Sequence, residues 1–463
     1  MQEDTTEKIK RRGDFVHKKV SLTEGSIAKA LVTFAIPLIL TSILQQLYNT
    51  ADLLIVGRYA GKVAMAAVGA TGPITQLIIG LFVGLSTGVG VVVAQNYGRR
   101  DYLRMASAIE TSFALAIGGG LVLTLVAYIF TPLFLQWMST PADIFQDAVD
   151  YMRLFFIGIV PLLVYNMGSG VLRSMGDSTR PLYYLIVGAV VNIVLDLVFI
   201  AYFHMGVMGA GIATILGQVA SAILVWLNLR HGNDTFWLNY KNIGLKKDSL
   251  NAILAIGIPA GLQTVVINLS NVIIQTMINR FGSNAVAGGA AASRIDGFVF
   301  LIIASLSMAA MTFAGQNIGA GRYDRLKKGT WVSLGMVCLA SGIMSVLLLV
   351  FCNSLIGLFN PTPEVVAYGR LSIIFLAPAY VIFGASEILG GILRGAGHAV
   401  VPMLVSILFM CIFRMIWVFF VLPQYYSIKT VYLSYPISWT LTFVVVGLYF
   451  VFGNWLVEEN QEA

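Results

Sequence analysis

About twelve long apolar stretches follow one another along this chain, with only short polar segments between them. Each is at least as long as the roughly 20 residues that a helix needs to cross the hydrocarbon core of a bilayer. Of the 463 residues, 58% are hydrophobic and 11% charged, whereas about 25% of the residues of a soluble domain are charged. The stretches are too continuous for barrel strands, so the sequence predicts an all-α membrane protein.

Charged residues, glycines and prolines mark where one expected span ends and the next begins. The first 27 residues are polar and lack the apolar core of a signal peptide, so we expect a tail (1–27) before an uncleaved first span. The longest loop, 231–249, divides the chain into two lobes, 28–230 and 250–457. The expected spans are 29–57, 63–96, 104–132, 149–172, 181–203, 208–229, 250–280, 285–317, 327–357, 368–393, 400–423 and 430–455.

Most basic loop residues fall on one side of the predicted bundle. Because Lys and Arg are enriched in cytoplasmic loops, this side is predicted to be cytoplasmic and to hold both termini, in a bacterial inner membrane. The same rule explains the net charge of +7 without a nucleic-acid partner. The loop cations of this side are Arg99, Arg100, Arg104, Arg173, Arg180, Lys241, Lys246, Lys247, Arg322, Arg325, Lys327, Lys328 and Arg394.

The second half of the sequence repeats short motifs of the first half in the same order. Each half is therefore predicted to be a six-helix unit. Because six is even, both halves insert with the same orientation and are related by a pseudo-twofold axis along the membrane normal, as in many transporters that work by alternating access. The repeated motifs are Ile36-Pro37 with Ile258-Pro259, Ala94-Gln95-Asn96 with Gly315-Gln316-Asn317, Tyr151-x-Arg153-Leu154 with Tyr368-x-Arg370-Leu371, and Leu172-Arg173 with Leu393-Arg394.

Two acidic residues of the first half fall inside expected spans, where a charge is costly and indicates function. They are Asp52, and Asp196 with Asn192 one helical turn before it. Glycines at the start of the sixth span are expected to loosen the helix and free the carbonyl of Ala210, with Thr214 one turn further. Such an all-oxygen set suits Na⁺, and the two carboxylates could instead exchange protons.

Structural roles compete with this interpretation. Asp52 could bind water or cap a neighbouring helix, because it lies late in its span. Asn192 and Thr214, each taken alone, could equally well hold neighbouring helices together by hydrogen bonds. The combination of the residues favours an ion site.

The second half has no acidic residue at the aligned positions but has other charged residues within its spans. Arg294, Asp296, Glu387 and Arg414 are the candidates. We expect Arg414 to pair with Glu387 or Asp296, since pairing offsets the cost of burying each charge. This structural interpretation is preferred to a second ion site.

Cysteine and histidine give no sign of a metal site or of a cofactor. Cys338, Cys352 and Cys411 lack metal-ligand spacing and lie in or beside apolar segments. The four histidines fall in the tail or in loops, and no zinc-protease, nucleophile-elbow or phosphate-loop motif is found in the sequence. The chain is therefore not expected to be an enzyme.

Taken together, the two halves and their motifs resemble the multidrug and toxic compound extrusion family over about residues 26–457. The resemblance implies an antiporter that exports cationic or amphipathic drugs, dyes or metabolites in exchange for Na⁺ or H⁺. We expect the transporter to act as a monomer in the lipid bilayer. Tyr48, Asn49, Asp296, Glu387 and Arg414 are weaker site candidates. The motifs that carry the resemblance are Tyr48-Asn49-x-x-Asp52, Ala94-Gln95-Asn96, Leu172-Arg173-x-x-Gly176 and Asn192-x-x-x-Asp196.

Within the family, the chain is most similar to the DNA-damage-inducible F branch. That similarity implies an ion site in the first lobe, at Asp52, Asn192, Asp196, the carbonyl of Ala210, and Thr214.

A flippase for lipid-linked precursors, from the wider superfamily, is the main alternative. It would need a cationic central cavity for a pyrophosphate, and the sequence places only Arg294 and Arg414 as cations within spans. An intramembrane enzyme is a weaker alternative, and a channel is disfavoured because no ring of filter residues repeats.

Overall fold

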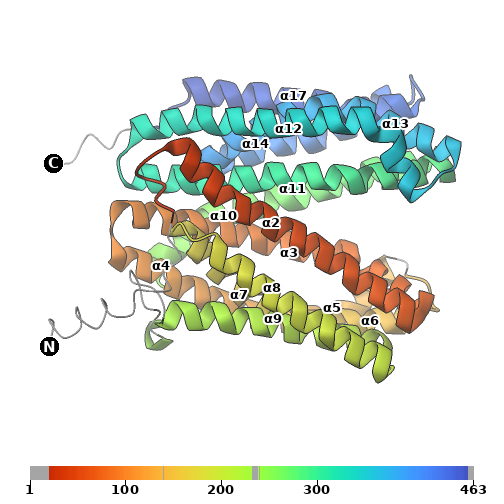
Figure 1. Cartoon of the computed structure of the whole chain (residues 1–463), viewed down its shortest axis with the longest axis horizontal. Coiled ribbons are helices and arrows are strands. Elements are labelled where there is room, and N and C mark those ends of the chain that lie inside the picture. The colour runs from red at the N-terminus through yellow and green to blue at the C-terminus, as the bar shows by residue number, and fades with distance from the viewer. Residues whose placement is uncertain (1–19, 139, 232–237, 239, 457–463) are drawn as a thin grey trace.

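The computed structural model describes residues 20–138, 140–231, 238 and 240–456, and these ranges contain helices but no strand. Long helices lie side by side in one bundle (Figure 1). Eleven helices of the described ranges are long and apolar enough to cross a membrane, and twelve if the pair bent by 44° at Gly158 counts as one span. The prediction of an all-α membrane protein with about twelve spans is confirmed.

Parts of the expected tail and of the expected loop between the lobes, residues 1–19, 232–237 and 239, lie outside the described residues, as do 139 and 457–463. The first half contains α2 (Ile27–Ile55), η2 (Val56–Ala60), α3 (Gly61–Arg99), α4 (Tyr102–Ala114), η3 (Leu115–Gly119), α5 (Gly120–Trp137), α6 (Phe145–Ile157), α7 (Ile159–Ser174), α8 (Thr179–Asp196), η4 (Leu197–Tyr202) and α9 (Gly206–His231).

The second half follows the 3₁₀ turn η5 (Tyr240–Asn242). Its helices are α10 (Lys247–Asn279), α11 (Ser283–Gly319), α12 (Tyr323–Phe359), α13 (Pro363–Leu376), η6 (Ala377–Ala379), α14 (Tyr380–Gly395), α15 (Val400–Ser406), η7 (Ile407–Phe413), α16 (Arg414–Ile416), η8 (Trp417–Val421) and α17 (Ile428–Phe452).

Turns with a left-handed glycine recur at matching places in the two halves. Gly61 and Gly282 have φ of 89° and 94° between the first two spans of each half, and Gly176 and Gly397 have φ of 88° and 96° after the fourth span. Residues other than glycine rarely adopt this left-handed backbone conformation. The sequence repeat is therefore also a repeat of backbone geometry.

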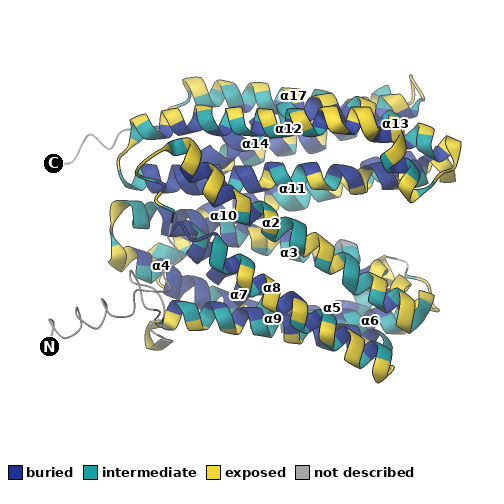
Figure 2. Cartoon of the chain, viewed as in Figure 1, coloured by how far each residue is buried: buried dark blue, intermediate teal, exposed yellow. Residues whose placement is uncertain are grey.

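Large apolar side chains cover the outside of the bundle. Leu103, Leu358 and Phe452 are 86%, 82% and 78% exposed, and Figure 2 shows exposed residues along the outer helix faces and buried residues on the inner ones. A soluble protein rarely leaves so much apolar surface in water. The outer surface is suited to lipid.

The first helix of each half crosses to the other half. α2, red in Figure 1, begins against α11 and α12 and also packs on α8, and its Leu31 and Phe34 belong to the core of the second half. In the same way, Ile253 and Ile256 of α10 belong to the core of the first half. Each lobe therefore completes its core with part of the other half.

The two halves touch backbone to backbone where α3 meets α10. A Cβ atom added at Gly84 or Gly88 would overlap backbone atoms of α10, including those of Gly257. Small residues at helix contacts let backbones approach closely in membranes. The lobes are therefore in close backbone contact along α3 and α10.

Two glutamines of the repeated motif link the lobes reciprocally near the end of the bundle that holds both described chain ends. Gln95 Nε2 donates to the carbonyl of Gly395 at 2.9 Å, and Gln316 Nε2 donates to the carbonyl of Ser174 at 2.7 Å. Ser174 and Gly395 occupy matching positions after the repeated Leu-Arg pair. We call this pair of bonds the glutamine clasp, and this end of the bundle the terminal face.

Residues 20–25, the N-terminal strap, lie across the terminal face. The Val20 N–H donates to the carbonyl of Gly176 in the first half at 3.2 Å. Arg325 of the second half donates to the carbonyls of Leu22, Glu24 and Gly25. The strap thus bonds to both lobes.

Candidate functional site

The two acidic residues of the first lobe each stand just before a π-helical segment. Asp52 lies in the last turn of α2, which passes into η2, and Asp196 is the last residue of α8, which passes into η4. η2 and η4 contact each other, and their Val56 and Ile200 are buried in one cluster. π segments interrupt the regular ladder of a helix and are frequent at functional sites.

The structure brings the side chains of the first-lobe candidates together. The carboxyl groups of Asp52 and Asp196 are close enough to interact electrostatically. Asn192 and Asp196 are both fully buried, and Asn192 Nδ2 donates to Thr214 Oγ1 at 3.4 Å. Three helices, α2, α8 and α9, therefore contribute side chains to one cluster.

Four buried carboxylate and amide oxygen atoms of this cluster lack hydrogen-bond partners among the described residues. Both carboxylate oxygens of Asp196, Oδ1 of Asp52 and Oδ1 of Asn192 make no hydrogen bond in the described part of the chain, and neither acid has a cation within 4.0 Å there. Buried polar groups are normally satisfied, because an unpaired one costs free energy. Oxygen atoms in this state are suited to bind a cation or protons.

Two tyrosines border the cluster. Tyr48 of α2 lies beside Asp52 and Thr214, and Tyr151 of α6 lies beside both acids. Tyr151 was not among the sequence candidates. It belongs to a motif repeated in the second half, but nothing local distinguishes it from the other tyrosines.

Two candidates differ from expectation. α9 is helical from Gly206 onward, so the loosened helix start expected before Ala210 is not seen. Ala210 is nevertheless fully buried in the same cluster as Val56 and Ile200. Asn49 is exposed.

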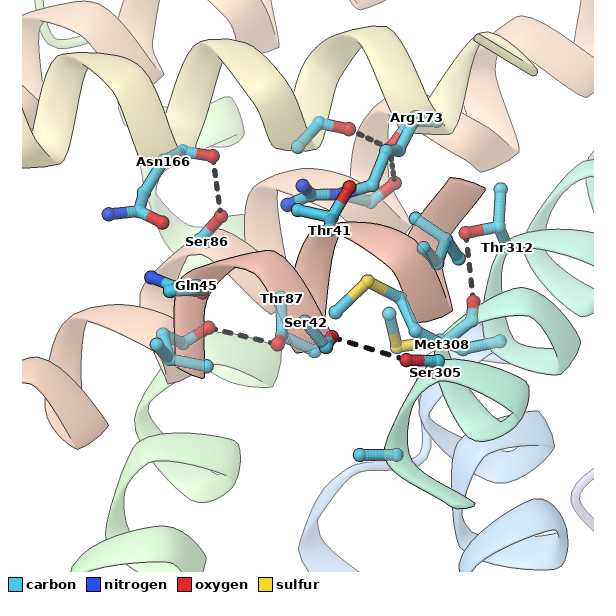
Figure 3. Close-up of a pocket in the computed structure, with 17 residues that line it drawn as sticks. Thr41, Ser42, Gln45, Ser86, Thr87, Asn166, Arg173, Ser305, Met308 and Thr312 are labelled. Atoms are coloured by element: carbon cyan, nitrogen blue, oxygen red, sulfur yellow. Dashed lines mark hydrogen bonds between the residues drawn. The ribbon is translucent and has the colours of Figure 1, made fainter. Parts of the chain in front are cut away.

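A central cavity of about 210 Å³ lies between the lobes and is lined by α2, α3, α7 and α11. In Figure 3, Ser42 Oγ of α2 meets Ser305 Oγ of α11 at 3.2 Å, and Ser86 Oγ donates to the carbonyl of Asn166 at 3.1 Å. Arg173 also lines this cavity, with no acid within 4.0 Å among the described residues. Arg173, which was predicted to lie in a loop, lies within α7.

Two further cavities continue into the second lobe. A cavity of about 220 Å³ shares Thr87 and Met308 with the central cavity and shares Glu387 with a cavity of about 420 Å³. We call the last one the second-lobe cavity, and α10, α11 and α17 are among its walls.

The pairing expected for Arg414 is wrong. Glu387 pairs instead with Arg394, at 3.5 Å. Arg414 Nε donates to Ser438 Oγ at 2.9 Å and Nη1 to Asn271 Oδ1 at 3.4 Å. The sequence could not identify these partners, because both are neutral residues of other helices, α17 and α10, and lie far from Arg414 along the chain. Arg294 is exposed, on the other side of α11 from buried Asp296.

Comparison with known proteins identifies relatives over the whole bundle. A family model described as MatE matches residues 37–198 and again 259–420, which confirms the repeat. Among similar curated proteins, the probable multidrug resistance protein YpnP of Bacillus subtilis (strain 168) is 30% identical over 440 residues, 95% of this chain and 98% of the relative. The probable multidrug resistance protein YoeA of the same strain is 27% identical over 444 residues, 93% of this chain and 95% of the relative.

Solved structures share the fold. A MOP superfamily transporter from Pyrococcus furiosus superposes with a TM-score of 0.87 at 22% identity, over 95% of this chain and 98% of that chain. A crystal structure of MATE in complex with MaL6 has the same TM-score and identity, over 94% and 98%.

Proposed function

This chain belongs to the MatE family of multidrug efflux transporters, and from that premise we propose that it is a secondary antiporter that exchanges cytoplasmic organic compounds for Na⁺ or H⁺. The observation that carries the proposal is the pair of facing carboxylates, Asp52 and Asp196, whose buried oxygens have no hydrogen-bond partner. The coupling site would comprise these acids with Asn192, Thr214 and the carbonyl of Ala210.

Helix α2 is the proposed link between the ion site and the substrate path. Thr41, Ser42 and Gln45 of α2 line the central cavity, and Asp52 follows Gln45 by seven residues, about 10 Å along a helix. A cation between the carboxylates would relieve their repulsion and change how the end of α2 packs on α8. Coupling can be only as strong as the difference in ion affinity between the two states of the lobe.

The proposed orientation places the terminal face in the cytoplasm. Basic residues concentrate on the loops of that face, which supports this side under the rule for membrane proteins. The glutamine clasp and the backbone contact of α3 with α10 would then close the cytoplasmic side. Because one chain contains both lobes, we propose that a monomer is sufficient for transport in the inner membrane.

The test is dye uptake into everted membrane vesicles, which corresponds to efflux from the cell, under separately imposed Na⁺ and H⁺ gradients. Asp52→Asn and Asp196→Asn are each expected to abolish gradient-driven efflux at normal expression, because an amide cannot supply the charge. Asp143→Asn is the matched control, since Asp143 is exposed, and it should retain parental efflux. Full activity of both site variants would refute the coupling site, and the gradient that drives the parent identifies the ion.

One observation favours the flippase alternative. Arg173 places a cation without an acidic partner in the central cavity. A lipid-linked pyrophosphate carries at least two charges, so a single arginine is a weak match, and the antiporter remains the proposal. Binding of a lipid-linked sugar pyrophosphate that is lost in Arg173→Gln, together with no dye efflux by the parent under either gradient, would reverse the preference.

A further inference from the structure

Asp296 and Arg414 line the second-lobe cavity as two opposite charges that are not paired with each other. Asp296 and Arg414 are 3% and 2% exposed, and no ion pair within 4.0 Å joins either of them to another described residue. A charge within the membrane without an opposite charge is costly and points to a functional site.

The guanidinium of Arg414 has a donor group without a hydrogen-bond partner among the described residues. Its Nε and Nη1 reach only the neutral groups of Ser438 and Asn271, and the ring of Tyr435 covers one face at 4.2 Å from Cζ. A guanidinium has five donors in a fork that matches a carboxylate. The Nη2 group makes no hydrogen bond to the described residues and is free to bind an anionic group in the cavity.

Asp296 offers the opposite charge on another wall. It lies on α11, and its buried Oδ1 has no hydrogen-bond partner among the described residues. Tyr435 lies near enough to interact electrostatically with both Asp296 and Arg414. Tyr435 therefore lies near both charged groups, which form no ion pair with each other.

Aromatic rings form the wall beside these charges. Trp439 packs against Phe383, Tyr435, Tyr380 and Phe300, with ring centroids 5.0 to 6.1 Å apart. Of these rings, those of Phe300, Phe383, Tyr435 and Trp439 line the cavity. Aromatic walls with a few placed polar groups are typical of sites for flat organic ligands.

The remaining charges of the region are already neutralised. Glu387 also lines the cavity, but Arg394 pairs with it at 3.5 Å. A ligand with a single charge would therefore satisfy Asp296 or Arg414 and leave the other unpaired. A ligand with both charges would satisfy the two, which avoids the cost of a buried lone charge.

We propose that the second-lobe cavity binds an aromatic zwitterion, with its anionic group on Arg414 and its cationic or donor group on Asp296. This inference rests on the proposed function, because it names a substrate class for the exporter. The three cavities share lining residues, so a substrate leaving this site would pass along them to the space between the lobes.

Two xanthene dyes of the same ring system test the proposal. Rhodamine 110 has a free carboxylate and a cationic ring system, and rhodamine 123 is its methyl ester, which lacks the anion. Binding to the purified full chain in nanodiscs, measured by fluorescence anisotropy without any ion gradient, should be about tenfold tighter or more for the free acid, the effect of one charged hydrogen bond. Equal affinities would overturn the proposal.

Arg414→Met should remove the preference for the free acid and leave ester binding unchanged. Arg414→Lys keeps the charge but loses the forked donor geometry of the guanidinium, so it should retain part of the preference. It also serves as the second variant in case Arg414→Met does not fold. Asp296→Asn should weaken the binding of both dyes. Arg370→Met is the matched control, because Arg370 of α13 is exposed and lines none of the three cavities; loss of the preference there, and not in Arg414→Met, would overturn the assignment.

Binding and coupling fail separately in these experiments. If Asp52→Asn abolishes efflux but keeps the dye preference, both proposals are supported. If the preference is absent while gradient-driven efflux by the parent depends on Asp52, only the zwitterion site is refuted.

Discussion

At the scale of single residues, the proposed ion site depends on atoms that the fold leaves unsatisfied. Asp196 is fully buried with both carboxylate oxygens unbonded in the described structure, and its neighbours Asp52, Tyr151 and Thr214 come from three other helices. Such a site costs stability and is retained only where it serves a purpose. Conservative substitutions there should change transport more than folding.

Tyr151→Phe removes one hydroxyl beside both acids. The concentration of driving ion needed for half-maximal efflux should rise about tenfold, because the hydroxyl is near enough to both acids to bond to the ion-loaded site, and one hydrogen bond to a charged group is worth about that factor. Expression and dye affinity should stay the same. The measurement is efflux against ion concentration in vesicles. Tyr128→Phe is the control, because the exposed Tyr128 ring keeps its contact with Arg153; an equal shift there would contradict a role for Tyr151.

The sequence predicted candidate residues from spacing along one helix and from charges within the spans. Asn192 and Asp196 share a helix face because they are four residues apart, and intramembrane acids are few. Tyr151 could not be identified, since its partners are distant in sequence. The expected pairing of Arg414 with an acid was wrong because Ser438 and Asn271, which are ordinary polar residues in the sequence, lie beside it.

At the scale of helices, two features position the lobes: the backbone contact of α3 with α10 and the glutamine clasp. In both features, the residues matter because of the atoms that they contact in the other lobe. Gly88 is one of many glycines in the sequence, but α10 leaves no room for a side chain at this position. The repeated Gln95 and Gln316 are visible in the sequence, but the reciprocity of their bonds appears only in the fold.

Gly88→Ala is expected to lower the melting temperature of the purified protein, because a new Cβ would overlap the backbone of α10. Overpacking typically costs about 1–3 kcal/mol, and here the neighbour is backbone, which cannot rotate away. Gly118→Ala provides the comparison, since Gly118 is exposed with no atom near an added Cβ. An equal change in both variants would argue against a tight helix contact.

The double variant Gln95→Leu, Gln316→Leu should part the lobes at the terminal face more often. Two lost hydrogen bonds of about 1 kcal/mol each shift an opening equilibrium by about tenfold or more. The measurement is labelling of Thr87→Cys in the central cavity by a membrane-impermeant maleimide added on that face, with the three native cysteines replaced by Ser.

Gln146→Leu tests whether any lost glutamine has this effect, because Gln146 is exposed and bonds only to Asp150 among the described residues. It should leave the labelling rate unchanged. An unchanged rate in the double variant as well would show that the clasp does not hold the face closed.

At the scale of the whole molecule, the sequence repeat was sufficient to predict two six-helix lobes. It could not predict that α2 and α10 cross, because exchanging the first helices leaves the hydrophobic pattern of each half unchanged. Leu31 and Phe34 are apolar residues of a membrane span in either arrangement, and only the cores show that they pack in the second lobe. The crossing makes the two halves one folding unit.

Fragments cut in the loop between α9 and α10 should therefore be unstable when made alone. The first-half fragment lacks Ile253 and Ile256, and the second-half fragment lacks Leu31 and Phe34. Limited proteolysis in membranes should degrade either fragment alone and spare both when they are produced together. Equal resistance of a fragment alone and in the pair would contradict shared cores.

Because α2 packs in the core of the second half, its packing partners are synthesised long after α2 itself. Phe34 is among the first spanning residues to leave the ribosome, while Ile303, in the same core, follows about 270 residues later. At about 5–20 residues per second, the delay is on the order of ten seconds to a minute. During translation the inner face of α2 has only lipid or the insertion machinery to cover it, so a slowed ribosome would prolong the period in which the nascent chain is most vulnerable to quality-control proteases.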